Sequence, residues 1–233
     1  MAKQAQMEAH PRPTLLSDFI LGSQDGVVNV LGIVLGLAAS GAATKFVIIA
    51  GLAALAAETV SMGAVAYTST RSRRSLYESE TQRELVEMRE VPELEREEVR
   101  VILRGWGYSE PEVNDLLERI EAKPKAWLDI MMAFELHLSP VEESAPRNSA
   151  IIVGSATLLG SIVPLLPFFF LRQNAVAASL IAVFFSGVML FMIGYYEARL
   201  TIGSLLRSGL RMLVIGLGSG FAGFLIGLAL RAY

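Results

Sequence analysis

Five long apolar stretches, interrupted by one charged segment, constrain the fold of this 233-residue chain more than any other feature. A helix needs about 20 mostly apolar residues to cross the hydrocarbon core of a bilayer. The apolar stretches cover roughly 17–40, 44–68, 148–171, 175–197 and 208–230. No segment shows the alternating polarity of a half-buried strand. We therefore predict an all-α membrane protein with five transmembrane helices.

The charged residues are concentrated between the second and third apolar stretches. Residues 71–147 contain 18 of the 23 acidic and 12 of the 20 basic residues, a local net charge of −6. The whole chain is 53% hydrophobic with a mean hydropathy of +0.48, which is too apolar for a soluble domain. We predict three parts: an N-terminal tail with transmembrane helices 1 and 2 (residues 1–70), an acidic helical domain (71–147), and transmembrane helices 3 to 5 (148–233).

Lysine and arginine residues near the membrane predict the orientation of the chain, because positively charged loops stay in the cytosol. One side carries Lys3, Arg12, Arg71, Arg73, Arg74, Arg147, Arg199, Arg207 and Arg211. The other side carries only Lys45, Arg172 and Arg231. The N terminus and the acidic domain are therefore predicted to be cytoplasmic.

The acidic segment contains several helix start and stop signals. The second transmembrane helix is predicted to continue beyond the membrane until Val91-Pro92. A second helix ends at Gly105-x-Gly107, and Ser109 with Glu112 forms a capping box for a third. A fourth helix covers KAWLDIMMAFELHL and ends before Pro140.

Three carboxylates, Asp18, Asp25 and Glu58, lie inside or at the edges of the first two apolar stretches, where a charge costs about 2.5–3.5 kcal/mol on insertion scales. Asp18 lies near the membrane interface, where an acid at a helix start explains it equally well, so Asp25 and Glu58 are the candidates. Asp25 and Asn29 are four residues apart and share a helix face, as do Glu58 and Met62. Two such carboxylates can be neutralised by two protons or by one divalent cation. The thioether of Met62 favours late first-row transition metals over magnesium or calcium. These residues predict a proton-coupled pathway for a divalent metal.

The acidic domain contains three further pairs of residues at helical spacing: Glu84/Glu87, Glu95/Glu98 and Met131/Glu135. Each pair shares one helix face, and together they could gather soft divalent cations. Composition alone favours a solvated acidic face for the four glutamates. A methionine on a helix that also bears tryptophan and phenylalanine is more often part of a core than a ligand.

Small residues recur at four-residue spacing in the first and last apolar stretches. The pairs are Gly22/Gly26, Gly32/Gly36, Gly216/Gly220 and Gly223/Gly227. Such spacing permits close contact between membrane helices, within one subunit or across a dimer. In the third stretch, Pro164 and Pro167 predict a break or a kink.

These residues and motifs together resemble the vacuolar iron transporter family. The resemblance extends from Leu16 to Leu230 and rests on SQDGVVNVLGIVLGLA, AETVSMGAVAY, EL-x-x-M followed by VP and E-x-x-E, WLDIMMAFELHL and IVPLLPFF. It implies a five-span homodimer that exports Fe²⁺, and often Mn²⁺, from the cytosol in exchange for protons. Such a protein is not an enzyme and needs no cofactor beyond the metal that it carries.

The resemblance also implies roles for individual residues. The metal-gathering residues of the family fall on Glu84, Glu87, Glu95, Glu98, Met131 and Glu135. The translocation residues fall on Asp25 and Met62. In one respect the chain departs from plant-like members, which have a glutamate eight residues before the methionine. That position is Ala54 here, and the acid is Glu58, one helical turn nearer to Met62.

Two other classes of protein remain as alternatives. A ferritin-like di-iron oxidase requires Glu-x-x-His pairs, whereas the two histidines, His10 and His137, do not follow a glutamate at that spacing. A non-transporting membrane scaffold that binds metal would not need Asp25 and Glu58 to face each other. No basic stripe lies outside the acidic domain, so no nucleic acid is expected as a partner. The absence of cysteine excludes thiolate metal sites.

The sequence also predicts the type of membrane. The N terminus lacks the apolar core and cleavage site of a signal peptide. The short chain without long tails favours a prokaryotic cell membrane, with a vacuolar membrane as the alternative.

Overall fold

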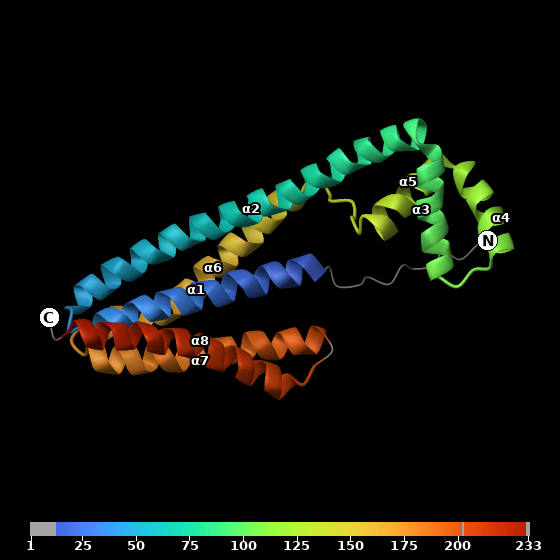
Figure 1. Ribbon diagram of the computed structural model, residues 1–233. Coiled ribbons are helices and arrows are strands. Elements are labelled where there is room, and N and C mark those ends of the chain that lie inside the picture. Colours follow the sequence, from blue (N-terminus) through green and yellow to red (C-terminus); the bar gives the residue numbers. More distant parts are fainter. Residues whose placement is uncertain (1–12, 202, 232–233) are drawn as a thin grey trace, which may run out of the picture. The chain divides into compact units, whose positions relative to one another are not determined.

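A computed structural model describes residues 13–201 and 203–231, and this part of the chain contains helices and no strands. The elements are α1 (Pro13–Ala39), α2 (Thr44–Glu90), α3 (Pro92–Gly105), α4 (Glu110–Glu121), α5 (Pro124–Ile130), the π-helix η1 (Met131–Glu135), α6 (Ala145–Phe170), α7 (Ala175–Leu200) and α8 (Leu205–Leu230) (Figure 1). The predicted all-α class is confirmed.

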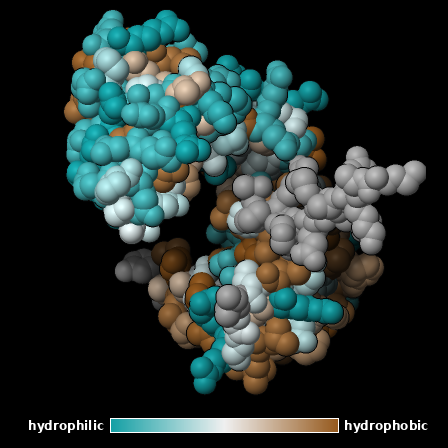
Figure 2. Space-filling model, turned by 90° about the vertical axis from the view of Figure 1, so that its right-hand side faces the viewer, coloured by the Kyte–Doolittle hydropathy of each residue, from teal (hydrophilic) through white to brown (hydrophobic). Residues whose placement is uncertain are grey.

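The chain divides into two compact units. We call the described residues up to Tyr67 and from Pro146 onward the membrane bundle, and Thr68–Ala145 the inserted domain. Hydrophilic side chains gather over the inserted domain, and apolar ones over the membrane bundle (Figure 2). Helix α2 belongs to both units, because its 47 residues form one uninterrupted helix.

Five helices of the described chain are long and apolar enough to cross a membrane, as predicted from the sequence. They are α1 from Leu15 onward, α2, α6, α7 and α8. Many of their large apolar side chains point away from the bundle, among them Phe170 at 81% exposure and Val60 at 72%. Such surface is stable against lipid rather than water, and the protein is therefore a multi-pass membrane protein.

The core of the membrane bundle is built around α1. Its members are Val30, Leu31, Val34 and Leu35 of α1, Val47 of α2, Leu165 and Phe168 of α6, and Ala178 and Ala182 of α7. The α1 residues follow the i, i+3, i+4 pattern of a single helix face. Helix α1 is consequently the central element of the bundle, and it carries Asp25 and Asn29.

Glycine residues bring α1 very close to its neighbours. A Cβ atom at Gly36 would lie 2.9 Å from the carbonyl oxygen of Gly223 on α8. At Gly26 it would collide with the backbone of Thr157 on α6. Gly216 and Gly220 of α8 similarly face leucine side chains of α7 and α1. All four small-residue pairs predicted from the sequence therefore have packing partners within one subunit.

Helix α6 continues through Pro164 and Pro167 to Phe170. The predicted break of the third transmembrane helix is therefore wrong. Both prolines are buried against neighbouring helices, and such packing allows a membrane helix to tolerate proline.

The inserted domain has a small core of its own. Val99 and Leu103 of α3 pack with Val113 and Leu117 of α4, and with Trp127. The helix boundaries follow the predicted signals. Helix α2 ends where Val91 leaves the helical conformation, and α4 begins with the capping box in which the Ser109 amide donates to Glu112 at 2.8 Å. Arg96 and Glu121 form an ion pair between α3 and α4.

The predicted fourth helix of this domain differs from the structure. Helix α5 ends at Ile130, and η1 continues the chain as a π-helix in which the Leu136 amide donates to the Met131 carbonyl oxygen at 3.1 Å. Helical structure stops at Glu135, and His137 has a φ of +53°. The predicted continuation of this helix through Leu138 is wrong, because the chain leaves the helical conformation after Glu135, where no glycine or proline marks the end.

Candidate metal site

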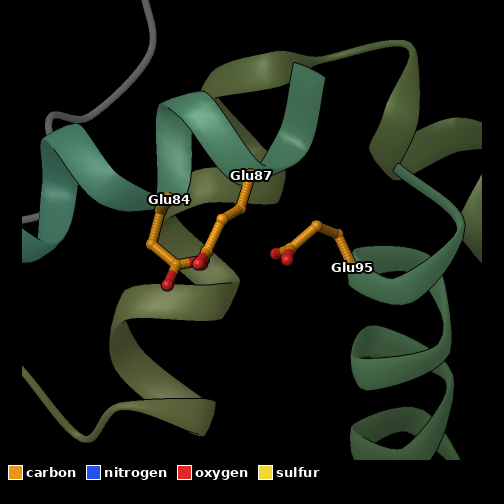
Figure 3. A group of neighbouring side chains, drawn as sticks. All are labelled: Glu84, Glu87 and Glu95. Carbon is orange, nitrogen blue, oxygen red and sulfur yellow. The ribbon is translucent and has the colours of Figure 1, made fainter. Parts of the chain in front are cut away.

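The inserted domain brings three glutamates from two helices together. Glu84 and Glu87 lie on the last turns of α2, and Glu95 lies on the first turn of α3. The break at Val91 turns the chain, so that Glu95 points back toward the two α2 carboxylates (Figure 3). One oxygen from each of the three lies within 4.8 Å of the others. Glu84 and Glu95 are each only 2% exposed.

Electrostatic interactions add Glu98 and Glu135 to this group. Burial raises the pKa of Glu95 to about 8, with further contributions from Glu98, Glu84, Glu135 and Glu87. Burial is also the main cause that raises the pKa of Glu135 to about 7, and the negative charges of Glu98 and Glu84 contribute to the same rise. These five residues, which we call the glutamate cluster, therefore share one electrostatic environment.

The part of α2 that belongs to the inserted domain shows the same effect. Burial raises the pKa of the Glu84 carboxyl, and the neighbouring Glu87 raises it further, whereas a hydrogen bond with Glu95 opposes the rise. Carboxylates this close together repel one another when ionised, so a bound proton or a cation lowers the cost of holding them together.

Several oxygens of the glutamate cluster have no hydrogen-bond partner among the described residues. They are the Oε2 atoms of Glu84, Glu95 and Glu135, all buried. A buried oxygen without a partner usually costs about 1–3 kcal/mol. The nearby Arg83 forms ion pairs with Glu87 at 3.1 Å and with Glu80 at 3.2 Å, and neither pair involves these three oxygens. A divalent cation would satisfy the inner oxygens, since hard and borderline cations accept carboxylate ligands.

The two methionines of η1 occupy different surroundings. Met131, the predicted soft ligand, is fully buried in the apolar core beside Val99 and Trp127. Met132 was not in the predicted ligand set. It is also buried, and its sulfur accepts a hydrogen bond from Thr81 Oγ1 of α2 at 3.8 Å. A role for Met131 as a metal ligand stays a prediction.

A second group of polar residues lies in the membrane bundle. The Asn29 amide donates to Asp25 Oδ1 at 3.1 Å, one helical turn apart on α1. Glu58 of α2 interacts with the Asp25 charge and lies within reach of Asn29. Its Oε2 atom is buried without a partner among the described residues. Met62 is half-buried and lies one turn further along α2.

An open groove of about 750 Å³ runs beside this membrane group. Asn29 and Glu58 line one part of it, and small residues of α1 and α8, such as Gly36 and Gly223, line another. The groove gives the two polar side chains access from outside the single subunit. We call it the polar groove.

Comparison with known proteins links this chain to one family. The model of the VIT family matches residues 16–228. Vacuolar iron transporter 1 of Arabidopsis thaliana is 34% identical over 212 residues, which are 90% of this chain and 84% of the relative. Protein CCC1 of Saccharomyces cerevisiae is 29% identical over 92% of this chain and 69% of the relative. The vacuolar iron transporter of Plasmodium falciparum is 27% identical over 93% of this chain and 82% of the relative.

The names of these relatives bear on two further expectations. Two of the three are named as transporters, which points to a protein that is not an enzyme. They are also named for the vacuole, so they give no support to the prokaryotic cell membrane that the sequence favoured. With a family model that spans nearly all of the described residues, this chain belongs to the VIT family.

Proposed function

We propose that this protein transports Fe²⁺ out of the cytosol and uses the glutamate cluster to gather the metal. The observation that carries the proposal is the meeting of Glu84, Glu87 and Glu95. Glu84 and Glu95 are buried, and each has a carboxylate oxygen without a partner among the described residues. Helix α2 carries Glu84 and Glu87 of this cluster and also Glu58 of the membrane group. The relatives named as iron transporters support iron as the cargo.

The glutamate cluster has more ligands than a single ion requires. With Met131 it would offer five carboxylates and one thioether, so we propose that two or more ions bind there. A carboxylate-rich site also accepts Mn²⁺, which is the second proposed cargo. The inserted domain would face the cytosol, because most of the basic loop residues lie at that end of the helices.

Exchange with protons is proposed to occur at Asp25 and Glu58. An isolated charge within a membrane bundle is costly, so both carboxyls would be protonated when the site is empty and ionised when a metal is bound. Asn29 would hold Asp25 in position, and the sulfur of Met62 would favour iron over harder cations. Entry of one divalent ion would then release two protons in the opposite direction.

We further propose a homodimer in which a second copy covers the polar groove. Asn29 and Glu58 line a groove that is open at the surface of the single subunit, where they would face lipid. Polar residues in membranes almost always face a bundle interior or a water-filled cavity. A two-fold axis beside α1 would place two such groups around one central pathway.

The proposed function is tested by metal flux into proteoliposomes that contain the purified full-length protein. Radioactive Fe²⁺ supplied anaerobically on the side of the inserted domain should accumulate inside, with protons moving outward. Metal binding without flux would instead indicate the non-transporting scaffold. In a parallel sample exposed to air, consumption of oxygen with formation of Fe³⁺ faster than in empty liposomes would indicate the oxidase.

A further inference from the structure

A second groove lies on the membrane bundle, separate from the polar groove and from the glutamate cluster. It has a volume of about 600 Å³ and is formed by α1, α7 and α8. This size falls within the range of about 300–1,000 Å³ that is typical of small-molecule sites. Neither Asp25 nor Glu58 lines it, and no role in metal transport accounts for it. We call it the apolar groove.

The walls of the apolar groove suit an extended hydrocarbon chain. Helix α8 contributes Leu217, Phe221, Phe224 and Leu228, whose spacing of four, three and four residues places them on one face. Phe221 is 59% exposed, and Leu180 of α7 is 67% exposed. In a bilayer, a concave and exposed apolar wall of this kind meets acyl chains.

Arg231, at the end of α8, gives the apolar groove a charged mouth. It is the only charged side chain among the described residues that line the groove. The guanidinium lies near the α1–α2 turn, where a Cβ atom at Gly41 would be 3.8 Å from its Nε atom. Gly41 has a φ of +86°, which favours glycine at this turn and leaves room for the arginine.

Among the described residues, the charged side chains at this end of the bundle are all positive. Lys45, Arg172 and Arg231 lie in or next to its turns, whereas residues 26–57 and 144–196 contain no aspartate or glutamate. No ion pair between Arg231 and a carboxylate occurs within the described residues. The guanidinium is therefore available to an anion from outside the chain, and its planar group binds phosphate oxygens in pairs.

We propose that the apolar groove binds an anionic glycerophospholipid. One acyl chain would lie along α8 between α1 and α7, and the headgroup phosphate would contact Arg231. The bound lipid would hold α1, which carries Asp25 and Asn29, against α7 and α8. This site does not depend on the proposed metal transport and can be tested without it.

The test uses full-length protein in liposomes and a tryptophan placed in the apolar groove. Both natural tryptophans, Trp106 and Trp127, lie in the inserted domain, so their signal is common to all variants. Phe221→Trp adds a reporter inside the groove. Phe170→Trp is the control, because Phe170 at the end of α6 is 81% exposed and does not line the groove.

Quenching by brominated lipids reports which lipid is bound. Brominated phosphatidylglycerol should quench Phe221→Trp at about a five-fold lower mole fraction than brominated phosphatidylcholine, as expected for one arginine near the membrane surface. Phe170→Trp should respond equally to the two lipids. Adding Arg231→Gln to Phe221→Trp should abolish the preference, whereas adding Arg172→Gln should preserve it.

Three results would overturn the proposal. Equal quenching of Phe221→Trp by both lipids would show ordinary, unselective lipid around the bundle. An equal loss of preference with Arg172→Gln would show a general effect of positive charge. A Phe221→Trp signal that neither lipid quenches would show that protein, such as a second copy of the chain, covers this face. Circular dichroism of each variant confirms that the helices are retained.

Discussion

At the scale of single residues, the proposed mechanism depends most on Asp25. Asp25→Asn keeps the size and the hydrogen-bonding partner Asn29 but cannot ionise. We expect metal flux to fall nearly to the level of empty liposomes, and a pH-sensitive dye inside should detect no proton movement. Asp18→Asn is a matched control on the same helix, and it should retain transport. Metal flux that continues without proton movement in the unmodified protein would show a uniporter.

The Asp25→Asn variant should still bind metal at the glutamate cluster. The two sites use different side chains, and Asp25 belongs to the membrane bundle. Calorimetric titration of the full-length variant with Mn²⁺ should therefore retain the binding seen for the unmodified protein. Loss of both binding and flux would indicate that the variant has misfolded.

Glu95 makes the glutamate cluster sensitive to pH. Its pKa is raised from an ordinary value of 4.5 to about 8, chiefly by burial. Because the folded state favours the protonated carboxyl, Glu95 contributes its full stabilisation of the metal-free fold below pH 4.5. This contribution to the free energy of unfolding is lost as the pH rises toward 8 and the carboxyl ionises. Metal affinity should change in the opposite direction, because the metal competes with protons and binds more tightly at pH 8 than at pH 6.

Glu95→Gln tests this pH dependence. The amide of the variant is neutral at every pH, so the free energy of unfolding of the metal-free inserted domain should rise by roughly 1–3 kcal/mol at pH 8. The variant should also bind metal weakly, because it has lost a carboxylate ligand. Chemical unfolding followed by tryptophan fluorescence measures the first effect, and titration with Mn²⁺ measures the second. Equal free energies of unfolding for the variant and the unmodified protein at pH 8 would contradict the prediction that ionisation of buried Glu95 destabilises the metal-free domain.

At the scale of elements, helix boundaries were predictable where one residue decides them. Val91-Pro92 ends α2, and Ser109 with Glu112 begins α4, because proline and a capping box act locally. The π-helix was not predictable, since its five residues are too few to reveal a period different from that of the preceding α-helix. The pairs in the glutamate cluster followed from helical spacing. Which of their oxygens meet depends on the turn at Val91, which no periodicity encodes.

The element η1 gives a direct test of the methionine ligand. Met131→Leu conserves volume in the core and should change the free energy of unfolding by less than about 1.5 kcal/mol. If its sulfur binds metal, Fe²⁺ affinity should fall while Mg²⁺ binding stays unchanged. Met132→Leu on the same π-helix is the matched control and should leave Fe²⁺ affinity as it was. Reversal of the two results would assign the ligand role to Met132.

At the scale of the whole molecule, the two compact units should respond differently to metal. Both tryptophans belong to the inserted domain, so their fluorescence follows that unit, whereas circular dichroism follows every helix. Saturating Mn²⁺ should raise the midpoint of the fluorescence transition, because a ligand stabilises the folded state that binds it. Removal of the metal by a chelator should reverse the shift. A single transition that moves equally in both signals would show that the units unfold together.

The close glycine contacts of α1 also have a consequence for motion during a transport cycle. At its glycines, α1 packs directly against the backbones of α6 and α8. These close backbone contacts leave α1 little freedom to slide. Helix α2 is less buried within the subunit, since 11% of its apolar membrane segment is buried, against 44% for α1 and 56% for α6. We therefore expect α1 and α6 to act as a stationary frame, while α2 rocks and carries Glu58 toward and away from Asp25. Since the chain has no cysteine, a pair of spin-labelled cysteines on α1 and α2 can follow that rocking without background.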